Sequence, residues 1–238
     1  MQPIILNWLW ITRPIEAQYG HMSSMTALHQ VSVRISPARR LPQLVAGLWL
    51  YGASMAMQIR ATLGLNPWDV LHEGLAKLTG LSFGLITAIT GVLVLLAWIP
   101  LKQRPGIGTI ANVVLIAVSV DVTLAILPAP QGLLPRIVFL TLGIVLNAVA
   151  FAAYVGSRLG PGPRDGLVTG FCRRTGISLR VTRTVLELIV LGTGWLLGGT
   201  VGIGTVLYAL GIGPLAQLFL PALTWRERSR PVCESPRT

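Results

Sequence analysis

The chain carries two copies of one segment at a constant offset of 96 residues. The residues of the first shared motif are Gly64, Pro67, Asp69, Leu71, Gly74, Thr79, Gly80 and Ser82, which recur as Gly160, Pro163, Asp165, Leu167, Gly170, Thr175, Gly176 and Ser178. A second motif at 106–109, Gly-Ile-Gly-Thr, recurs at 202–205. Chance similarity between apolar segments would not keep polar residues and glycines in register, so the sequence predicts an internal duplication. We expect function to lie where the two halves meet.

Composition indicates a membrane protein. Apolar residues make up 53% of the chain and charged residues 11%, and the mean hydropathy is +0.69. A soluble domain is about 25% charged. Runs of roughly 20 apolar residues are long enough to cross a bilayer as helices. The six predicted spans are 41–60, 81–101, 108–127, 137–157, 181–197 and 201–223. Gly198 and Gly199 are predicted to form the turn between the last two.

The basic residues are distributed unevenly between the two sides of this arrangement. If the N-terminus is cytoplasmic, sixteen of the nineteen Lys and Arg residues fall on the cytoplasmic side, which leaves Arg60, Lys77 and Arg136 outside. Basic loops resist translocation, so the sequence predicts a multi-pass membrane protein with both termini in the cytoplasm. The net charge of +11 then reflects topology and contact with anionic lipid. Nucleic-acid binding is not expected, because the arginines are spread over several loops.

Each copy contains three predicted spans, and an odd number places the second copy upside down in the membrane. The predicted fold is therefore an all-α polytopic membrane protein of two inverted three-helix repeats. Residues 39–130 form the first unit and 131–225 the second. Residues 1–38 are predicted to be an unstructured cytoplasmic extension, and 226–238 a basic cytoplasmic tail.

Each unit also carries a short broken or re-entrant helix after its first span. Proline cannot continue a helix, so the chain is expected to break at Asn66-Pro67 and at Gly162-Pro163. Asp69 and Asp165 are predicted to be the N-caps of the short helices that follow, and Gly80 and Gly176 to end them. Such a segment either lines a substrate path with its N-terminus or is an amphipathic elbow in the interface.

The Gly-Ile-Gly-Thr motif is expected to serve close helix packing, with Thr109 or Thr205 capping the helix start. It lacks the Lys-Ser/Thr ending of a phosphate-binding loop.

Polar residues within the predicted spans complete the set of substrate-path candidates. These residues are Asn112, Asp121, Asn147, Glu187 and Gln217. Gln217 occupies the position equivalent to Asp121, which suggests a shared central location. Glu187 can pair with Arg183 four residues earlier as a structural anchor. Asp121 can serve a proton or cation, can be a protonated structural acid, or can reach the outer interface of the membrane.

These motifs together resemble the YczE/YitT-like bacterial integral membrane proteins, and most closely the YczE branch. The resemblance rests on Asn-Pro-Trp-Asp-Val-Leu at 66–71, Arg-Pro-Gly-Ile-Gly-Thr at 104–109 and Gly-Pro-Gly-Pro-Arg-Asp-Gly-Leu at 160–167, with the second Gly-Ile-Gly-Thr at 202–205. It covers about residues 39–225. It implies a polytopic protein of the bacterial inner membrane, and it carries over no catalytic or binding residues.

The predicted function is a small secondary transporter or permease that works by alternating access on an unknown small molecule or ion. The alternative is a membrane scaffold or assembly factor that docks cytoplasmic partners through basic loops. We expect no enzyme activity, because His72 has no matching nucleophile, base or metal ligands, and we expect no cofactor and no metal. The lipid bilayer is the predicted partner, and homo-oligomerisation stays open.

Overall fold

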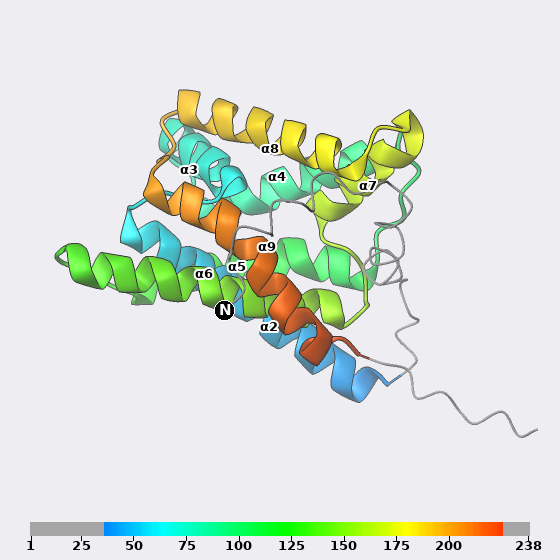
Figure 1. Cartoon of the computed structure of the whole chain (residues 1–238), viewed down its shortest axis with the longest axis horizontal. Coiled ribbons are helices and arrows are strands. Elements are labelled where there is room, and N and C mark those ends of the chain that lie inside the picture. Colours follow the sequence, from blue (N-terminus) through cyan, green and yellow to red (C-terminus); the bar gives the residue numbers. More distant parts are fainter. Residues whose placement is uncertain (1–35, 226–238) are drawn as a thin grey trace, which may run out of the picture.

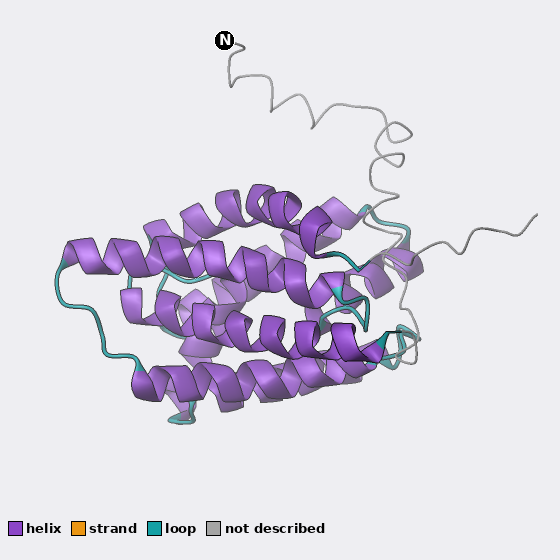
Figure 2. Ribbon diagram, turned by 90° about the horizontal axis from the view of Figure 1, so that it is seen from below, coloured by secondary structure: helices purple, strands orange, loops and turns teal. Residues whose placement is uncertain are grey.

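The computed structural model describes residues 36–225, and this part of the chain consists of helices joined by short connections (Figures 1 and 2). The helices are α2 (Pro37–Ala61), α3 (Pro67–Thr79), α4 (Phe83–Trp98), α5 (Ile107–Ile126), α6 (Leu133–Gly156), α7 (Pro163–Thr175), α8 (Leu179–Leu196) and α9 (Ile203–Leu223). Six of them coincide with the predicted spans, and α3 and α7 are the two predicted short helices. The predicted extension, apart from its last residues, and the predicted tail lie outside the described residues.

The duplication in the sequence is matched in the helix boundaries. The helices of 37–126 begin at Pro37, Pro67, Phe83 and Ile107, and those of 133–223 begin at Leu133, Pro163, Leu179 and Ile203. Every start is displaced by the same 96 residues that separate the motifs. We call residues 37–126 the first unit and 133–223 the second unit.

The helices form two layers, each with members from both units (Figure 1). In one layer, α2 packs on α5 and α6, and α6 packs on α9; we call it the α2 layer. In the other, α3 packs on α4 and α8, and α7 packs on α4 and α8; we call it the α3 layer. Each unit therefore gives its first and last helices to the α2 layer and its middle pair to the α3 layer.

Contacts between α2 and α6 recur with the two units exchanged. A Cβ atom on Gly47 of α2 would meet Tyr154 N at 2.9 Å and Ala150 O at 3.3 Å. On the equivalent Gly143 of α6 it would meet Gln58 N at 3.5 Å and Ser54 O at 3.2 Å. Gln58 and Ser54 are themselves equivalent to Tyr154 and Ala150 at the offset of 96. The two helices are thus antiparallel and pack through small residues, which allow close backbone approach.

The Gly-Ile-Gly-Thr motif of each unit packs on the opposite unit, as the prediction of close packing requires. Gly108 N donates to Leu159 O at 3.1 Å, and the equivalent Gly204 N donates to Leu63 O at 2.8 Å. The threonines also satisfy the helix starts, because Thr109 Oγ1 accepts from Gly106 N at 3.1 Å and Thr205 Oγ1 from Gly202 N at 3.3 Å.

The predicted breaks before α3 and α7 are confirmed, but the predicted N-caps are wrong. Asn66 caps α3, and its side chain accepts hydrogen bonds from the backbone N–H groups of Trp68 and Asp69. Gly162 holds the same position in α7. Because proline fills the first helical position, the aspartates fall at the third and lie inside the first turn. Gly80 and Gly176 end the helices with φ 73° each, as predicted.

Three helices in the described part of the chain are long and apolar enough to cross a membrane, namely α5, α6 and α9. The pair α3 and α4, bent by 115°, gives a fourth candidate if it is counted as one broken span. The α8 helix is less apolar than these three because it carries three charged residues, Arg180, Arg183 and Glu187. The count of six spans stays a prediction.

Candidate functional site

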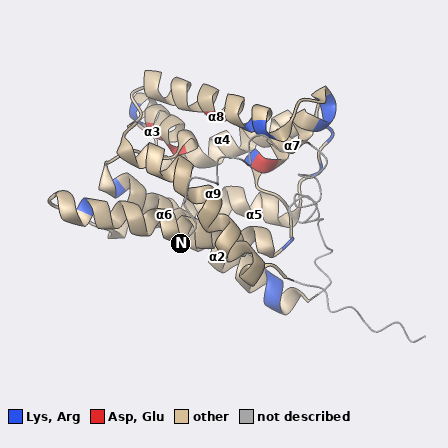
Figure 3. Ribbon diagram, in the orientation of Figure 1, with Lys and Arg blue, Asp and Glu red and all other residues tan. Residues whose placement is uncertain are grey.

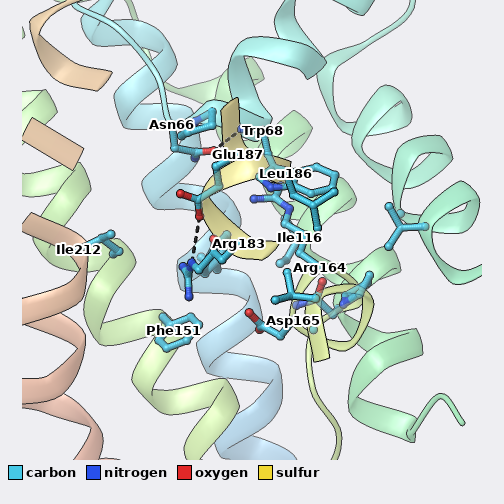
Figure 4. Close-up of a pocket in the computed structure, with 18 of the residues that line it drawn as sticks. Asn66, Trp68, Ile116, Phe151, Arg164, Asp165, Arg183, Leu186, Glu187 and Ile212 are labelled. Atoms are coloured by element: carbon cyan, nitrogen blue, oxygen red, sulfur yellow. Dashed lines mark hydrogen bonds and ion pairs between the residues drawn. The ribbon is translucent and has the colours of Figure 1, made fainter. Parts of the chain in front are cut away.

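A cavity of about 500 Å³ lies between the two layers, and all eight described helices contribute to its wall. Figure 4 shows the first turns of α3 and α7 facing this space, together with side chains from α6, α8 and α9. Its volume is in the range of small-molecule sites, which is roughly 300–1,000 Å³. The breaks before the short helices therefore place two helix N-termini at the wall of one cavity.

The structure brings most of the sequence-predicted site residues to this cavity. Those that line it are Asn66, Pro67, Asn112, Gly162, Pro163, Asp165, Glu187 and Gln217. Asp69 lies behind the wall with a fully buried side chain. Asp121 and Asn147 are located elsewhere.

The first turns of α3 and α7 are in direct contact. The guanidinium of Arg164 lies over the indole ring of Trp68, 4.8 Å from the centroid, and these two residues occupy equivalent positions of the two units. Arg164 Nη2 is also 3.7 Å from Asp69 Oδ1. The other oxygen, Asp69 Oδ2, accepts from Asn66 Nδ2 at 2.5 Å. Asp69 thus supports the cap of α3 and pairs with a cation from the other unit.

His72 lies one turn further along α3 and is buried, whereas the sequence analysis gave it no role. Its Nδ1 is 3.5 Å from Asp69 Oδ1 and 3.3 Å from Thr87 Oγ1 of α4. Its ring packs edge-on against Phe83. His72 therefore connects the start of α3 to α4 beside the cavity.

Asp165 has a different environment from its counterpart Asp69. Its carboxylate is half-buried at the cavity wall and accepts a hydrogen bond from the Tyr154 hydroxyl at 3.3 Å. Among the described residues, no Lys, Arg or His side chain forms an ion pair with it. Burial raises the pKa of the Asp165 carboxyl above its ordinary value of 3.8, against the opposing influence of Arg183, the Tyr154 hydroxyl and Arg164.

The predicted pair on α8 is present at the cavity wall. Arg183 Nε donates to Glu187 Oε1 at 3.0 Å (Figure 4). The Arg183 side chain is 56% exposed and the Glu187 side chain 39% exposed, so the pair faces open space rather than packed protein. The expectation of a structural anchor accounts for the contact, but both groups also face the cavity.

Asp121 lies on α5 and is a structural acid, because its carboxylate binds the start of α4. It does not line the cavity. Asp121 Oδ2 accepts from the Ser82 hydroxyl at 2.6 Å, and Oδ1 accepts from Gly84 N at 2.7 Å. A carboxylate at this place satisfies the free N–H groups of the α4 N-terminus and complements its dipole. The expected central location shared by Asp121 and Gln217 is therefore wrong, because only Gln217 lines the cavity.

Asn147 is buried within the α2 layer. Its Nδ2 donates to Ser54 Oγ at 2.8 Å, and its Oδ1 accepts from the Tyr208 hydroxyl at 2.9 Å. The asparagine thus joins α6 to α2 and α9, and these polar bonds hold the layer together.

Sequence reasoning missed the aromatic part of the wall. The cavity is lined by Tyr51, Trp68, Phe151, Tyr154 and Tyr208, which come from α2, α3, α6 and α9. Each is an ordinary apolar residue of a predicted span or motif, so only packing distinguishes it from a lipid-facing aromatic residue. No group of three or more His, Cys, Asp or Glu residues in the described region could hold a metal ion.

Comparison with known sequences gives a match that spans the whole helical region. A family model described as a family of unknown function (DUF6198) matches residues 38–221. The chain belongs to this family. The matched segment contains every residue that lines the cavity, so the cavity lies within the region that the family model describes.

Three curated relatives also match. An uncharacterized protein of Haemophilus influenzae is 41% identical over 177 residues, which cover 74% of this chain and 81% of the relative. The uncharacterized membrane protein YczE of Bacillus subtilis is 36% identical over 173 residues, covering 72% and 80%. The uncharacterized protein YyaS of the same organism is 24% identical over 179 residues, covering 74% and 89%. The resemblance to the YczE branch is confirmed, and with it the assignment to membrane proteins. No solved structure matches.

Proposed function

We propose that the chain is a small secondary transporter that works by alternating access, with the α3 layer moving against the α2 layer around the cavity. The single observation that carries this proposal is an asymmetry between units that otherwise form equivalent contacts. Inverted repeats that enclose a site between them are a recurrent architecture of secondary transporters.

The asymmetry concerns the last two helices of each unit. In the first unit, α4 packs along α5, and a Cβ atom on Gly84 would lie 2.1 Å from Ala117 O. The bonds from Asp121 to Ser82 and Gly84 hold this contact. In the second unit, α8 packs on α3 and α7, while α9 packs on α6. The cavity is thus closed between α4 and α5 and bordered by separated helices at α8 and α9.

The second unit keeps residues suited to the missing contact. Ser178 and Gln217 are equivalent to Ser82 and Asp121, and a glutamine side chain has an amide oxygen that can accept from a hydroxyl. Gly213 is equivalent to Ala117, and a Cβ atom there would meet nothing within 4 Å. In the opposite state, α8 packs on α9 around Gly213, and α4 separates from α5. Arg180 occupies the position equivalent to Gly84. Because arginine is larger than glycine, we expect the contact between α8 and α9 to be looser than the contact between α4 and α5.

The charge distribution supports the membrane orientation that this mechanism needs. Lys and Arg residues gather mainly at one end of the molecule (Figure 3). Arg60, at the end of α2, and Arg136, at the start of the antiparallel α6, belong to the other end, which has fewer basic residues. Antiparallel α2 and α6 then begin on opposite sides of the membrane, with the α2 start on the basic, cytoplasmic side.

Topology is tested with two single cysteines in a Cys172→Ser, Cys233→Ser background. Lys102→Cys lies between α4 and α5, and Val201→Cys lies in the equivalent connection between α8 and α9. We expect a membrane-impermeant maleimide to label Val201→Cys in intact cells and Lys102→Cys only after the membrane is opened. Labelling of both from the same side contradicts the inverted arrangement.

State exchange is tested with two cysteine pairs in the same background. The pair Ser82→Cys and Asp121→Cys replaces residues already in contact and is expected to form a disulfide rapidly in the membrane. The pair Ser178→Cys and Gln217→Cys is expected to form one more slowly, because it requires α8 to reach α9. The control pair Ser178→Cys and Leu218→Cys, with the second cysteine about 100° further around α9, is expected to stay reduced.

A scaffold with one resting shape gives a different result. In that case the first pair cross-links and the Ser178 and Gln217 positions stay as unreactive as the control. That outcome refutes alternating access.

A further inference from the structure

We propose that the cavity binds a monovalent organic cation, with the Asp165 carboxylate as its charged partner. This inference rests on the proposed transport function and names the class of its substrate. It depends on the charge balance of the cavity, on the repeat and on the aromatic wall.

The charged groups around the cavity leave one negative charge. Arg183 pairs with Glu187 at 3.0 Å, and Arg164 is 3.7 Å from the buried Asp69. Asp165 is left with a neutral hydroxyl as its hydrogen-bonded neighbour in the described part of the chain. Arg183 and Arg164 are near enough to favour the charged form of Asp165, but neither forms an ion pair with it, and their charges are already balanced by Glu187 and Asp69. A partly buried carboxylate without an ion pair is costly, so a bound cation or a proton stabilises it.

The repeat explains why Asp165 lacks an ion pair across the units. Asp69 is paired with Arg164 of the other unit, and Asp165 is the equivalent of Asp69. The position equivalent to Arg164 is Trp68, which carries no charge. The duplicated arrangement therefore keeps one cross-unit ion pair and replaces the cation of the other with an indole. A ligand can supply the positive charge that position 68 does not.

The rest of the wall suits an organic cation better than a metal ion. Phe151 and Tyr154 are in edge contact with ring centroids 5.5 Å apart, and Tyr51 packs on Tyr154 at 6.0 Å. Aromatic faces bind quaternary and protonated amines through cation–π attraction. The carboxylate and hydroxyl oxygens that a bare ion would need do not gather at Asp165, where a metal-ligand group is not found among the described residues.

Protons should compete with the ligand for Asp165. The groups that face this carboxylate are the Tyr154 hydroxyl on α6, Arg164 on α7, and Arg183 and Glu187 on α8. Protonation of Asp165 removes the charge that attracts the cation. Cation affinity is therefore expected to fall as the pH is lowered through the raised pKa of this carboxyl.

The test uses two probes of matched size and opposite charge, tetraphenylphosphonium and tetraphenylborate. Binding to the purified full-length chain in lipid nanodiscs is measured by equilibrium dialysis, and empty nanodiscs are subtracted. We expect saturable binding of tetraphenylphosphonium near one per chain, weaker at acidic pH, and no saturable binding of tetraphenylborate.

Variants separate the site from the lipid and from the fold. Asp165→Asn is nearly isosteric and is expected to weaken cation binding on the order of tenfold or more, and to remove its pH dependence. Asp165→Glu should retain binding. Glu73 is an acid that does not line the cavity, so the matched substitution Glu73→Gln should leave cation binding unchanged.

Three results overturn the inference: equal binding of both probes, unchanged affinity in Asp165→Asn, or an equal loss in Glu73→Gln. The cysteine-pair experiment is independent of any ligand. State exchange without cation binding therefore refutes only the substrate class, whereas absence of exchange refutes the proposed function.

Discussion

Neutralising Asp121 is expected to open the contact between α4 and α5 and shift the protein toward its opposite state. The Asp121 carboxylate accepts two short hydrogen bonds, 2.6 Å from the Ser82 hydroxyl and 2.7 Å from Gly84 N. In Asp121→Asn the amide oxygen can still accept from Gly84 N and the amide NH₂ can donate to the Ser82 oxygen, so two bonds to a charged group become two neutral bonds. The other helices and their connections are unchanged, so the loss falls mainly on the state in which α4 touches α5.

The size of the shift follows from the bonds weakened. A hydrogen bond to a charged group contributes about 1.5–3 kcal/mol and a neutral one about 0.5–1.5 kcal/mol, so the two bonds together lose about 2 kcal/mol. If that energy is absent from the opposite state, the ratio of the two states changes by roughly 30-fold, since about 1.4 kcal/mol corresponds to tenfold. The interaction of the carboxylate with the α4 dipole adds to this in the same direction.

The assay is the rate of disulfide formation between Ser178→Cys and Gln217→Cys, with and without Asp121→Asn. When exchange is fast relative to oxidation, the rate follows the population of the opposite state and should rise with Asp121→Asn until that state dominates. Glu73→Gln serves as the control, because its amide oxygen can still accept from Thr200 N. An unchanged or slower rate in Asp121→Asn, in a protein that still folds, refutes the role of Asp121 in the closed contact.

Two further predictions concern stability, each measured as the midpoint of thermal unfolding in detergent. Gly204→Ala should destabilise by about 1–3 kcal/mol, because its Cβ atom would lie 2.6 Å from Gly64 O, a backbone atom that cannot move aside easily. Gly192→Ala, in open space on α8, should instead be neutral or stabilising by up to about 1 kcal/mol, and a matching loss there would rule out the contact as the cause. Asn147→Ala should cost about 1–3 kcal/mol, since it removes the buried bond to Ser54, whose hydroxyl keeps only Tyr51 O, and the amide oxygen that accepts from the Tyr208 hydroxyl. A midpoint equal to that of the unchanged chain would contradict this.

The sequence was sufficient to predict the helices and their breaks, because those depend on local rules. Proline at 67 and 163 sets each short helix start, and glycine at 80 and 176 ends it. The cap assignment failed by three residues because the pattern Asn-Pro-Trp-Asp offers two acceptable caps. Proline at the first helical position favours the asparagine, and the aspartate then becomes available for Arg164.

The hydrogen-bond partners of Asp121 could not be predicted, because they depend on which helices pack together. Its sequence neighbours are apolar, and its hydrogen-bond donors lie 37 and 39 residues away at the start of α4. Equivalence with Gln217 suggested a common environment, but that holds only if both units are packed alike. The packing of α4 on α5 without the same packing of α8 on α9 separates the two positions.

Divergence between equivalent residues gives the duplicated fold its chemistry. Two identical units would place the same charges on both sides of the cavity and would form either two cross-unit ion pairs or none. Replacement of one partner leaves Arg164 stacked on Trp68, Asp69 neutralised within the wall, and Asp165 facing the cavity. Asp69, which forms the ion pair, belongs to the unit whose last two helices pack together, and Asp165, which forms none, belongs to the unit whose last two helices are apart. A cation bound at Asp165 would therefore enter on the α8 and α9 side, and closure of that side around Gly213 and Gln217 is the movement that would enclose it.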